Sequence, residues 1–228
     1  MSDILVKILI GILFGVLLGL ITIPLSRKLI LSRSEDPGDT ILLKNKLLIA
    51  SLIVLGVLSS VGVILTGEDT TVIIRNLVLL IPIFSIAVVD SIIRKIPNPL
   101  LLAMILTQAI YVAYVSITQH STQLLITSFI GAFIGLFACT VPSLLRIPVG
   151  AGDIKYSGVI GLCIYLGGYF QAMVIMGLLA LVVYVVLKAS KKGDMKTMIP
   201  MGPLLSAGTV ISMCFPLIDS LVSEVGIF

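Results

Sequence analysis

Two aspartates lie inside otherwise apolar segments of this chain. Asp90 follows the apolar run 86–89, and Asp153 follows the small residues Gly150, Ala151 and Gly152. A carboxylate in hydrocarbon costs on the order of 3 kcal/mol, so such an acid usually faces a cavity, a partner or a site. The other aspartates and glutamates all fall in loops or tails of the sequence. Asp90 and Asp153 are therefore the first candidates for chemistry.

Each aspartate also has an ordinary interpretation when it is considered alone. Asp90 could reach the membrane interface and pair with Arg94 or Lys95, and Asp153 could cap the helix that follows it. Lys155 could tune the acid beside it or simply anchor a helix end in the interface.

As a pair, the two carboxylates can hydrolyse a peptide through an activated water. Two carboxylates close together do not both ionise easily, so one keeps a proton while the other is charged. The charged one takes a proton from a water that attacks the peptide carbonyl, and the protonated one polarises that carbonyl. This is the chemistry of an aspartyl protease.

Other catalytic chemistries lack their residues here. The single histidine, His120, is expected on the opposite side of the membrane from the aspartates, which disfavours a Ser-His-Asp or Cys-His site. The sequence has no HExxH motif, and Cys139, Cys163 and Cys214 form no CxxC pair, so we expect no metal. No cofactor is implied.

The composition places these residues in a membrane. Of 228 residues, 58% are hydrophobic and 11% are charged, which no ordinary soluble domain shows. The net charge is +4, but nucleic-acid binding needs a basic patch on a folded polar surface, which so apolar a chain does not offer. We therefore expect no nucleic-acid partner. Apolar runs about as long as a bilayer is thick recur along the chain. They fall at about 4–24, 47–66, 76–93, 99–117, 124–145, 154–167, 169–187 and 199–217.

The sequence therefore predicts an all-α, polytopic membrane bundle of about eight transmembrane helices. The sixth segment is the shortest, and its break at Gly167-Gly168 is tight, so seven or nine spans are alternatives. Thirteen of the 15 lysines and arginines fall in one alternating set of connections, which predicts that this set is cytoplasmic. Both termini are then outside, and both aspartates lie at the cytoplasmic face. We expect two parts, residues 1–75 with a cytoplasmic loop at 25–46, and a catalytic part at 76–228.

The first span carries a stripe of small residues. Gly11, Gly15 and Gly19 repeat every fourth residue, which lets a neighbouring helix approach closely. Packing inside the molecule is the first interpretation, and self-association through this face is the second.

Three motifs resemble the type IV prepilin peptidase family. Asp90 is followed after a short basic turn by Ile96-Pro97-Asn98, then come Gly150 to Lys155 and a segment from Ile199 to Leu205 that contains Pro200, Gly202 and Pro203. Their order and separation are similar to those of the family. The resemblance covers roughly residues 76–217 and is looser over the first two spans.

The resemblance implies a function in a multi-pass protein of the cell membrane. It implies cleavage of the short basic leader of pilin, pseudopilin or preflagellin precursors at the cytoplasmic face, with Asp90 and Asp153 as catalytic residues. Substrate-binding or site-shaping positions would be Pro97, Asn98, Gly150, Gly152, Lys155, Pro200, Gly202 and Pro203. The partners would be prepilin-like precursors and the lipid bilayer.

One departure from the family concerns the first cytoplasmic loop. Many members carry paired CxxC motifs there that bind zinc, and they also methylate the new N-terminus, whereas residues 27–46 contain no cysteine. The zinc loop is absent, and methyl transfer is open. Presenilin-like peptidases share GxGD, but Val89 and the Pro200 to Pro203 segment disfavour them. The alternatives from other classes are an ion or proton-coupled transporter that uses the two aspartates, and a structural subunit of a secretion machine.

Overall fold

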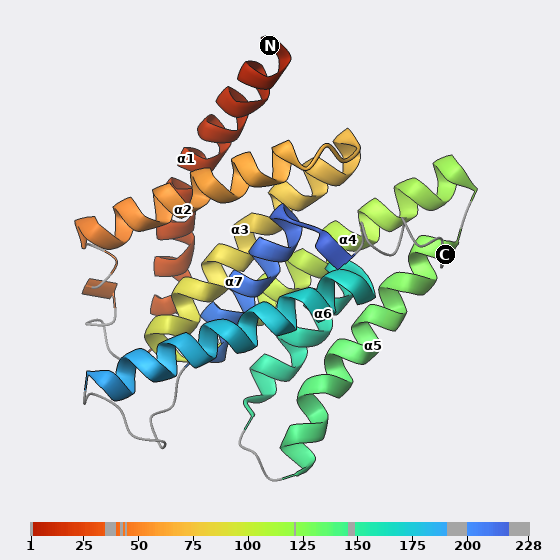
Figure 1. The fold of residues 1–228 in the computed structure, drawn as a ribbon. Coiled ribbons are helices and arrows are strands. Elements are labelled where there is room, and N and C mark those ends of the chain that lie inside the picture. The colour runs from red at the N-terminus through yellow and green to blue at the C-terminus, as the bar shows by residue number, and fades with distance from the viewer. Residues whose placement is uncertain are drawn as a thin grey trace.

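The chain folds into helices alone over the part that can be described. A computed structural model describes residues 2–34, 40, 41, 43, 45–120, 122–145, 149–190 and 200–218, with the side chains of the first helix from residue 4 onward. Within these ranges there are seven α-helices and no strand. They are α1 (Ser2–Leu31), α2 (Lys46–Leu65), α3 (Thr70–Ile93), α4 (Asn98–Gln119), α5 (Gln123–Leu144), α6 (Ala151–Ala189) and α7 (Met201–Cys214), as Figure 1 shows.

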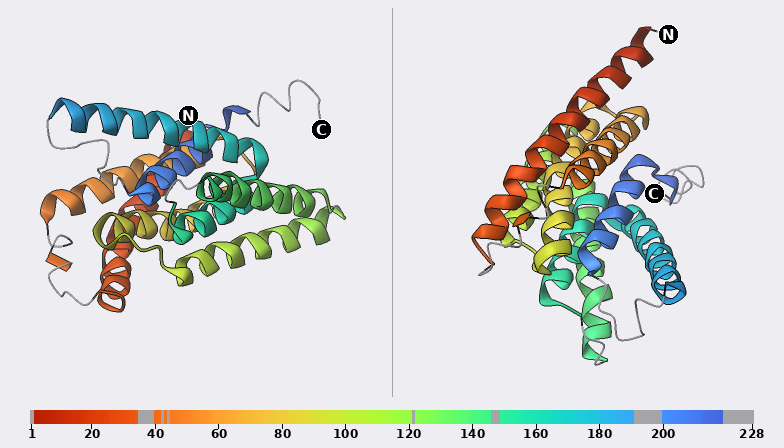
Figure 2. Two further views of the ribbon diagram at one scale, coloured as in Figure 1. Left: turned by 90° about the horizontal axis from the view of Figure 1, so that it is seen from below. Right: turned by 90° about the vertical axis from the view of Figure 1, so that its left-hand side faces the viewer.

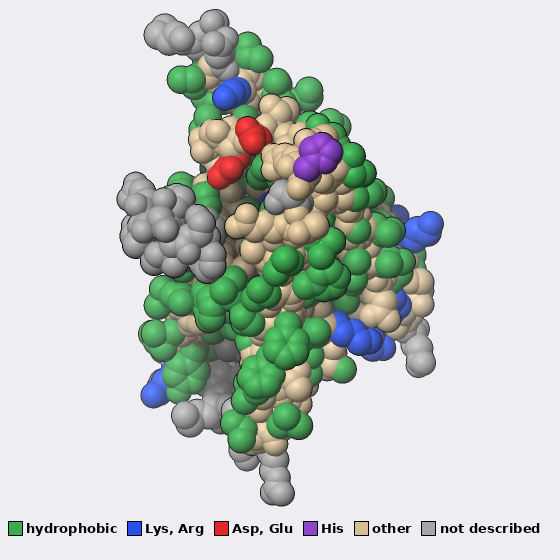
Figure 3. All heavy atoms as spheres, turned by 90° about the vertical axis from the view of Figure 1, so that its right-hand side faces the viewer, with side chains coloured by type: hydrophobic (Ala, Val, Ile, Leu, Met, Phe, Trp, Pro, Cys, Tyr) green, Lys and Arg blue, Asp and Glu red, His purple; other side chains and the backbone are tan. Residues whose placement is uncertain are grey.

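Six of these helices, α1 to α6, are long and apolar enough to cross a membrane. The seventh, α7, has 14 residues and so extends about 21 Å, less than the roughly 30 Å of a hydrocarbon core. Large apolar side chains are exposed along most of the helices, and Figure 3 shows them over one face of the molecule. This surface suits lipid rather than water, and it agrees with the prediction of a helical, multi-pass membrane protein.

A sharp bend divides α6 into two arms. Tyr165 has a φ of 58° and a ψ of −171°, a left-handed, non-helical conformation that is uncommon outside glycine. The arms 151–164 and 166–189 therefore run in different directions, as the change of course along α6 in Figure 1 shows. The bend falls two residues before the predicted break at Gly167-Gly168. With α6 divided, eight helical segments correspond to the eight apolar segments predicted from the sequence.

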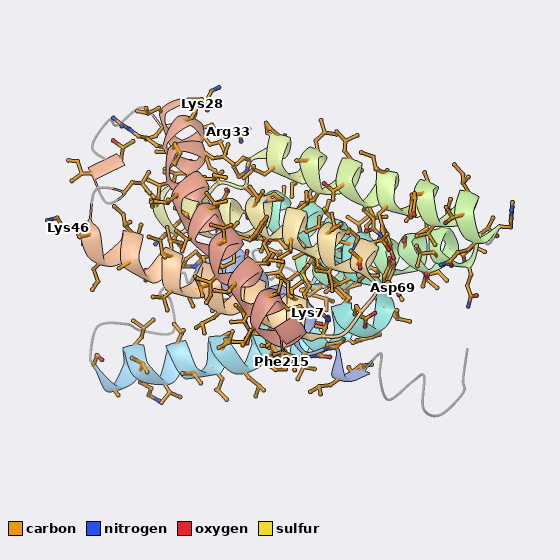
Figure 4. The ribbon with its side chains drawn as sticks, turned by 90° about the horizontal axis from the view of Figure 1, so that it is seen from above. Lys7, Lys28, Arg33, Lys46, Asp69 and Phe215 are labelled. Carbon is orange, nitrogen blue, oxygen red and sulfur yellow. The ribbon has the colours of Figure 1, made fainter. Side chains whose placement is uncertain are left out.

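The helices run back and forth between two ends of the bundle. One end, here the acidic end, carries Glu68, Asp69 and His120 in the turns after α2 and α4. The opposite end, here the basic end, carries eight of the described lysines and arginines: Arg27, Lys28, Arg33, Lys46, Arg94, Lys95, Lys155 and Lys188. Figure 4 shows Lys28 and Arg33 at the end of α1 and Lys46 at the start of α2, on the side away from Lys7 and Asp69. The Lys95 Nζ donates to the carbonyl of Arg33 at 3.4 Å, which joins the ends of α1 and α3.

The glycine stripe of α1 packs inside the molecule. A Cβ atom on Gly15 would lie 2.4 Å from the Cα of Val57 in α2, and on Gly11 and Gly19 it would lie 3.0 and 2.9 Å from the Cα atoms of Val61 and Ile53. The Ser60 hydroxyl donates to the carbonyl of Gly11 at 2.6 Å across the same contact. Figure 2 shows α1 lying across α2 and α3. This face is therefore covered within the chain, and self-association through other surfaces stays a prediction.

Helix α3 forms the centre of the bundle. It contacts α1, α2, α4 and α7, and it contributes more buried residues than any other described helix. Among the largest buried side chains are Leu79, Leu80, Ile83 and Ile86 of α3, together with Met104, Tyr156, Ile160 and Leu205 from α4, α6 and α7. Burial of such side chains fixes α3, and with it the depth and direction of Asp90 near its end.

Candidate active site

Asp90 is buried in the last turn of α3, where the first turn of α7 meets it. Its side chain is 5% exposed, and its Oδ2 accepts a hydrogen bond from the backbone N–H of Gly202 at 3.0 Å. The first N–H groups of a helix lack partners within the helix and carry its positive dipole end, so they favour a carboxylate. Among the described residues Asp90 forms no ion pair within 4.0 Å. Pairing with Arg94 or Lys95 is therefore not what holds Asp90 in place.

Gly202 fits against Asp90 because it has no side chain. A Cβ atom there would lie 2.6 Å from Oδ2, 2.8 Å from Cγ and 2.9 Å from Cβ of Asp90. Pro200 precedes α7 in an extended conformation and Pro203 falls in its first turn, where a missing N–H breaks no helical hydrogen bond. The segment from Pro200 to Pro203 thus starts a helix directly against the acid. Ile199, the first residue of this motif, lies outside the described residues.

Asp153 lies in the first turn of α6, three residues after Gly150, which is the N-cap of this helix. Gly150 has the extended conformation of a helix N-cap, with φ −65° and ψ 138°, and its carbonyl accepts from the N–H of Ile154 at 3.2 Å. The backbone amide of Gly150 in turn interacts with the Asp153 carboxylate, which is the reciprocal half of a capping box. The N-cap of α6 is therefore Gly150 and not Asp153, whose half-buried carboxylate lies inside the first turn of the helix.

The structure places the two aspartates at one end of the bundle, on α3 and α6, close enough for a negative charge on Asp90 to act on Asp153. Gly152 packs on the turn that follows α3, because a Cβ atom there would lie 3.2 Å from the Cβ of Ile96. Asp90 and Asp153 are the only acids that the described residues place within helices α3 to α7. Three helix ends, from α3, α6 and α7, therefore meet at one pair of carboxylates.

A second set of polar residues holds these three helix ends together, and the sequence alone did not suggest it. Tyr156 is fully buried, and its hydroxyl shares a hydrogen bond of 2.7 Å with the hydroxyl of Ser206. The Ser206 hydroxyl also approaches the carbonyl of Ile83 at 3.4 Å. Tyr156 follows Asp153 by three residues and Ser206 follows Gly202 by four, so each lies one turn along the same helix face. That spacing was the available signal in the sequence.

No protein-family model, curated protein or solved structure matches this chain.

The remaining predicted positions lie to one side of the aspartates. Pro97 is buried and caps α4, and Asn98 is its exposed first residue. Asn98 and the exposed Lys155 line the mouth of a 460 Å³ groove whose other lining residues, from α4, α5 and α6, are apolar. Lys155 forms no ion pair within 4.0 Å in the part of the chain that the structure describes. The interfacial anchor expected for Lys155 stays a prediction.

A second apolar groove, of 520 Å³, runs between α2, α3 and α7. Ala87 and Pro203 line it close to the aspartates, because Ala87 precedes Asp90 by one helical turn and Pro203 adjoins Gly202. At its far end it reaches Cys214 and Phe215, and no charged residue lines it. We call it the α2–α3–α7 groove.

The described residues contain no group of three or more His, Cys, Asp or Glu side chains placed to hold a metal ion. His120 ends α4, whose 22 residues extend about 33 Å from Asn98, so the histidine lies far from the aspartates. Cys139, Cys163 and Cys214 are buried free thiols. Among the described residues, the ionisable side chains at the pair are the two carboxylates, which can hold a water.

Proposed function

We propose that this chain is a membrane aspartyl endopeptidase that removes the short basic leader of pilin-like precursors at the cytoplasmic face of the cell membrane. The observation that carries the proposal is the meeting of Asp90 and Asp153 at one end of the bundle, each set in a different membrane helix. The motifs that resemble prepilin peptidases, at Asp90 to Asn98, Gly150 to Lys155 and Pro200 to Pro203, all lie around this pair. The positive-inside distribution of lysine and arginine supports the same face.

The geometry suits general acid–base hydrolysis. Gly202 fixes one oxygen of Asp90, which leaves Oδ1 for a water or a substrate carbonyl. With one proton shared by the pair, the charged carboxylate takes a proton from water while the water oxygen attacks the peptide carbonyl carbon. The protonated carboxylate donates to the carbonyl oxygen. Collapse of the tetrahedral intermediate breaks the C–N bond, and a proton passes to the leaving amine.

The α2–α3–α7 groove is the place we assign to the apolar segment of the substrate. It opens along the lipid-facing side of three helices and leads to Ala87 and Pro203, beside the aspartates. An apolar helix can enter it laterally from the bilayer and bury its side chains against groove leucines. The groove at Asn98 and Lys155 is less suitable, because Lys155 at its mouth repels a basic leader.

The experiment is leader cleavage by conservative variants of the two acids. A pilin-type precursor is co-expressed with wild type, Asp90→Asn, Asp153→Asn or the control Asp69→Asn, which changes an exposed acid at the acidic end. Loss of a general acid or base costs about 10²–10⁴-fold in rate, so both site variants should leave the precursor unprocessed while Asp69→Asn cleaves as wild type does. Full cleavage by either site variant would falsify the catalytic assignment. Failure of folded wild type to cleave any of several precursor classes would refute the peptidase function itself.

A further inference from the structure

A second cluster of polar residues surrounds Arg75 near the acidic end. Arg75 is 7% exposed, and its Nε and Nη2 donate to the Asn76 Oδ1 at 3.1 and 2.7 Å. Its Nη1 donates to the hydroxyl of Tyr165 at 2.6 Å and to the Oε1 of Gln108 at 3.4 Å. All of these acceptors are neutral. Over the described ranges no carboxylate lies within 4.0 Å of the guanidinium.

A buried cation without an anion is costly. Ionised groups taken out of water are normally paired, and an arginine inside a membrane bundle usually marks a ligand or an ion path. The rings of Tyr111 and Tyr165 lie 4.6 and 5.4 Å from the Arg75 guanidinium carbon and stabilise the charge by cation–π contact. They do not neutralise it. Over the described ranges the guanidinium therefore has neutral hydrogen-bond partners and no carboxylate in contact with it.

Arg75 also lines a cavity of 260 Å³. Tyr111, Tyr165 and the exposed Glu68 line it too, together with apolar residues such as Val72. Because Arg75 is buried and Glu68 is exposed, the cavity has a cation at its floor and an acid at its rim. Asp69 adds a second negative charge beside the rim, and Figure 3 shows acidic side chains at the surface next to the histidine.

We propose that this cavity binds the head group of a zwitterionic phospholipid, with its phosphate on Arg75 and its ammonium towards Glu68. The arginine fork suits phosphate, and the acids at the rim repel a purely anionic head group and favour one that carries a primary ammonium. The inference does not depend on the peptidase function, since the site lies at the opposite end of the bundle from the aspartates.

The depth of Arg75 supports a lipid rather than a soluble ligand. Arg75 follows the start of α3 by five residues, or about 7.5 Å along the helix axis. The head-group layer on each side of a bilayer is about 5–7 Å thick, so a helix that enters at its outer edge carries the guanidinium to the inner boundary of that layer, within reach of lipid phosphates. Tyrosines are typical of the same layer, and apolar lining residues such as Leu124 can contact the acyl chains.

Native mass spectrometry of the purified full chain tests this proposal. The protein in detergent is titrated with phosphatidylethanolamine, phosphatidylcholine or phosphatidylglycerol, and the lipid-bound fraction gives an apparent affinity. We expect wild type to bind phosphatidylethanolamine best of the three lipids. Glu68→Gln should weaken phosphatidylethanolamine binding about threefold and remove the preference for ethanolamine. Arg75→Gln should weaken binding of this lipid at least tenfold. Lys46→Gln, which removes an exposed charge at the basic end, should bind as wild type does. Soluble phosphoethanolamine alone should not compete.

Two outcomes would overturn the proposal. If wild type and Glu68→Gln retain the three lipids equally, Arg75 serves only to fix the bend at Tyr165 and no head-group site exists. If soluble phosphoethanolamine competes at concentrations comparable to those of the lipid, the ligand is a free zwitterion. Because Glu68 is exposed, Glu68→Gln should fold normally, and its lipid preference tests the proposal even if Arg75→Gln does not fold.

Discussion

The contact between Gly202 and Asp90 gives the sharpest prediction, because the single methyl group added in Gly202→Ala must displace the acid. The new Cβ would lie 2.6 Å from Oδ2 and 2.9 Å from Cβ of Asp90, whereas ordinary contact begins at 3.4 Å. Rotation of the carboxylate can move the oxygen away but not the Cβ, which is fixed to the backbone of α3. The two helices must therefore separate by at least about 0.5 Å at this point, and by about 0.8 Å if the carboxylate keeps its orientation.

This separation has a cost in both stability and rate. Overpacking of this kind lowers the free energy of unfolding by about 1–3 kcal/mol. The higher helix propensity of alanine offsets up to about 1 kcal/mol of that loss. A misplacement near 1 Å in a catalytic constellation costs about 10²-fold, so we expect kcat for leader cleavage to fall by roughly that factor. The 3.0 Å hydrogen bond from Gly202 to Asp90 would lengthen as well.

The assay combines cleavage rates with thermal unfolding in the same detergent. The three buried free cysteines allow unfolding to be followed with a thiol-reactive dye. Gly177→Ala is the matched control, because Gly177 is an exposed residue inside α6 with nothing within 4 Å of its would-be Cβ. That control should keep full activity and melt at or slightly above the wild-type temperature. If Gly202→Ala behaves in the same way, α7 does not press on Asp90 and the site geometry argued above is wrong.

Two further predictions follow from the contacts around the site. Tyr156→Phe removes the 2.7 Å hydrogen bond to Ser206, so it should lower stability by about 1 kcal/mol and reduce kcat more than it changes KM, whereas Tyr184→Phe in the second arm of α6 should change neither. Leu55→Trp narrows the α2–α3–α7 groove, and Leu102→Trp narrows the groove at Asn98. The two leucines are a matched pair, because Leu55 is 52% exposed and Leu102 is 55% exposed. Only Leu55→Trp should raise KM for a full-length precursor, and the opposite result would move the substrate helix to the other groove.

Much of the fold could be predicted because the bilayer restricts what a sequence can do. Every apolar segment expected from the sequence corresponds to a helix or an arm of α6, since in lipid only helices satisfy the backbone within one segment. The placement of Asp90 and Asp153 at one end of the bundle followed from the same logic: alternate helices reverse direction, so the end of the third and the start of the sixth lie at one face. The prediction of where α3 begins was less accurate. Because Arg75 interrupts the apolar run, the sequence predicted a start at residue 76, whereas the helix begins at Thr70.

What the sequence could not supply is the choice of partners between helices. The α1 glycine stripe indicates a close neighbour but does not say that it is α2, and Tyr156 and Ser206 become a pair only once α6 and α7 are placed side by side. The bend of α6 was expected at Gly167-Gly168 because glycine favours breaks. In the structure it occurs at Tyr165, whose hydroxyl is held by Arg75 and Gln108, so tertiary contacts rather than local preference determine its position.

The bend at Tyr165 also explains how a helix as short as α7 can position Asp90. Through Ser206 it contacts Tyr156 in the first arm of α6, and its Ser212 hydroxyl donates to the carbonyl of Gly168 in the second arm at 2.9 Å. Because α6 turns between these contacts, α7 is held by both arms and cannot slide along either one. The first arm carries Asp153, and α7 donates to Asp90, so both acids depend on elements that are anchored at this bend. A ligand on Arg75, which donates to the Tyr165 hydroxyl, would therefore act on the same bend from the opposite end of the bundle.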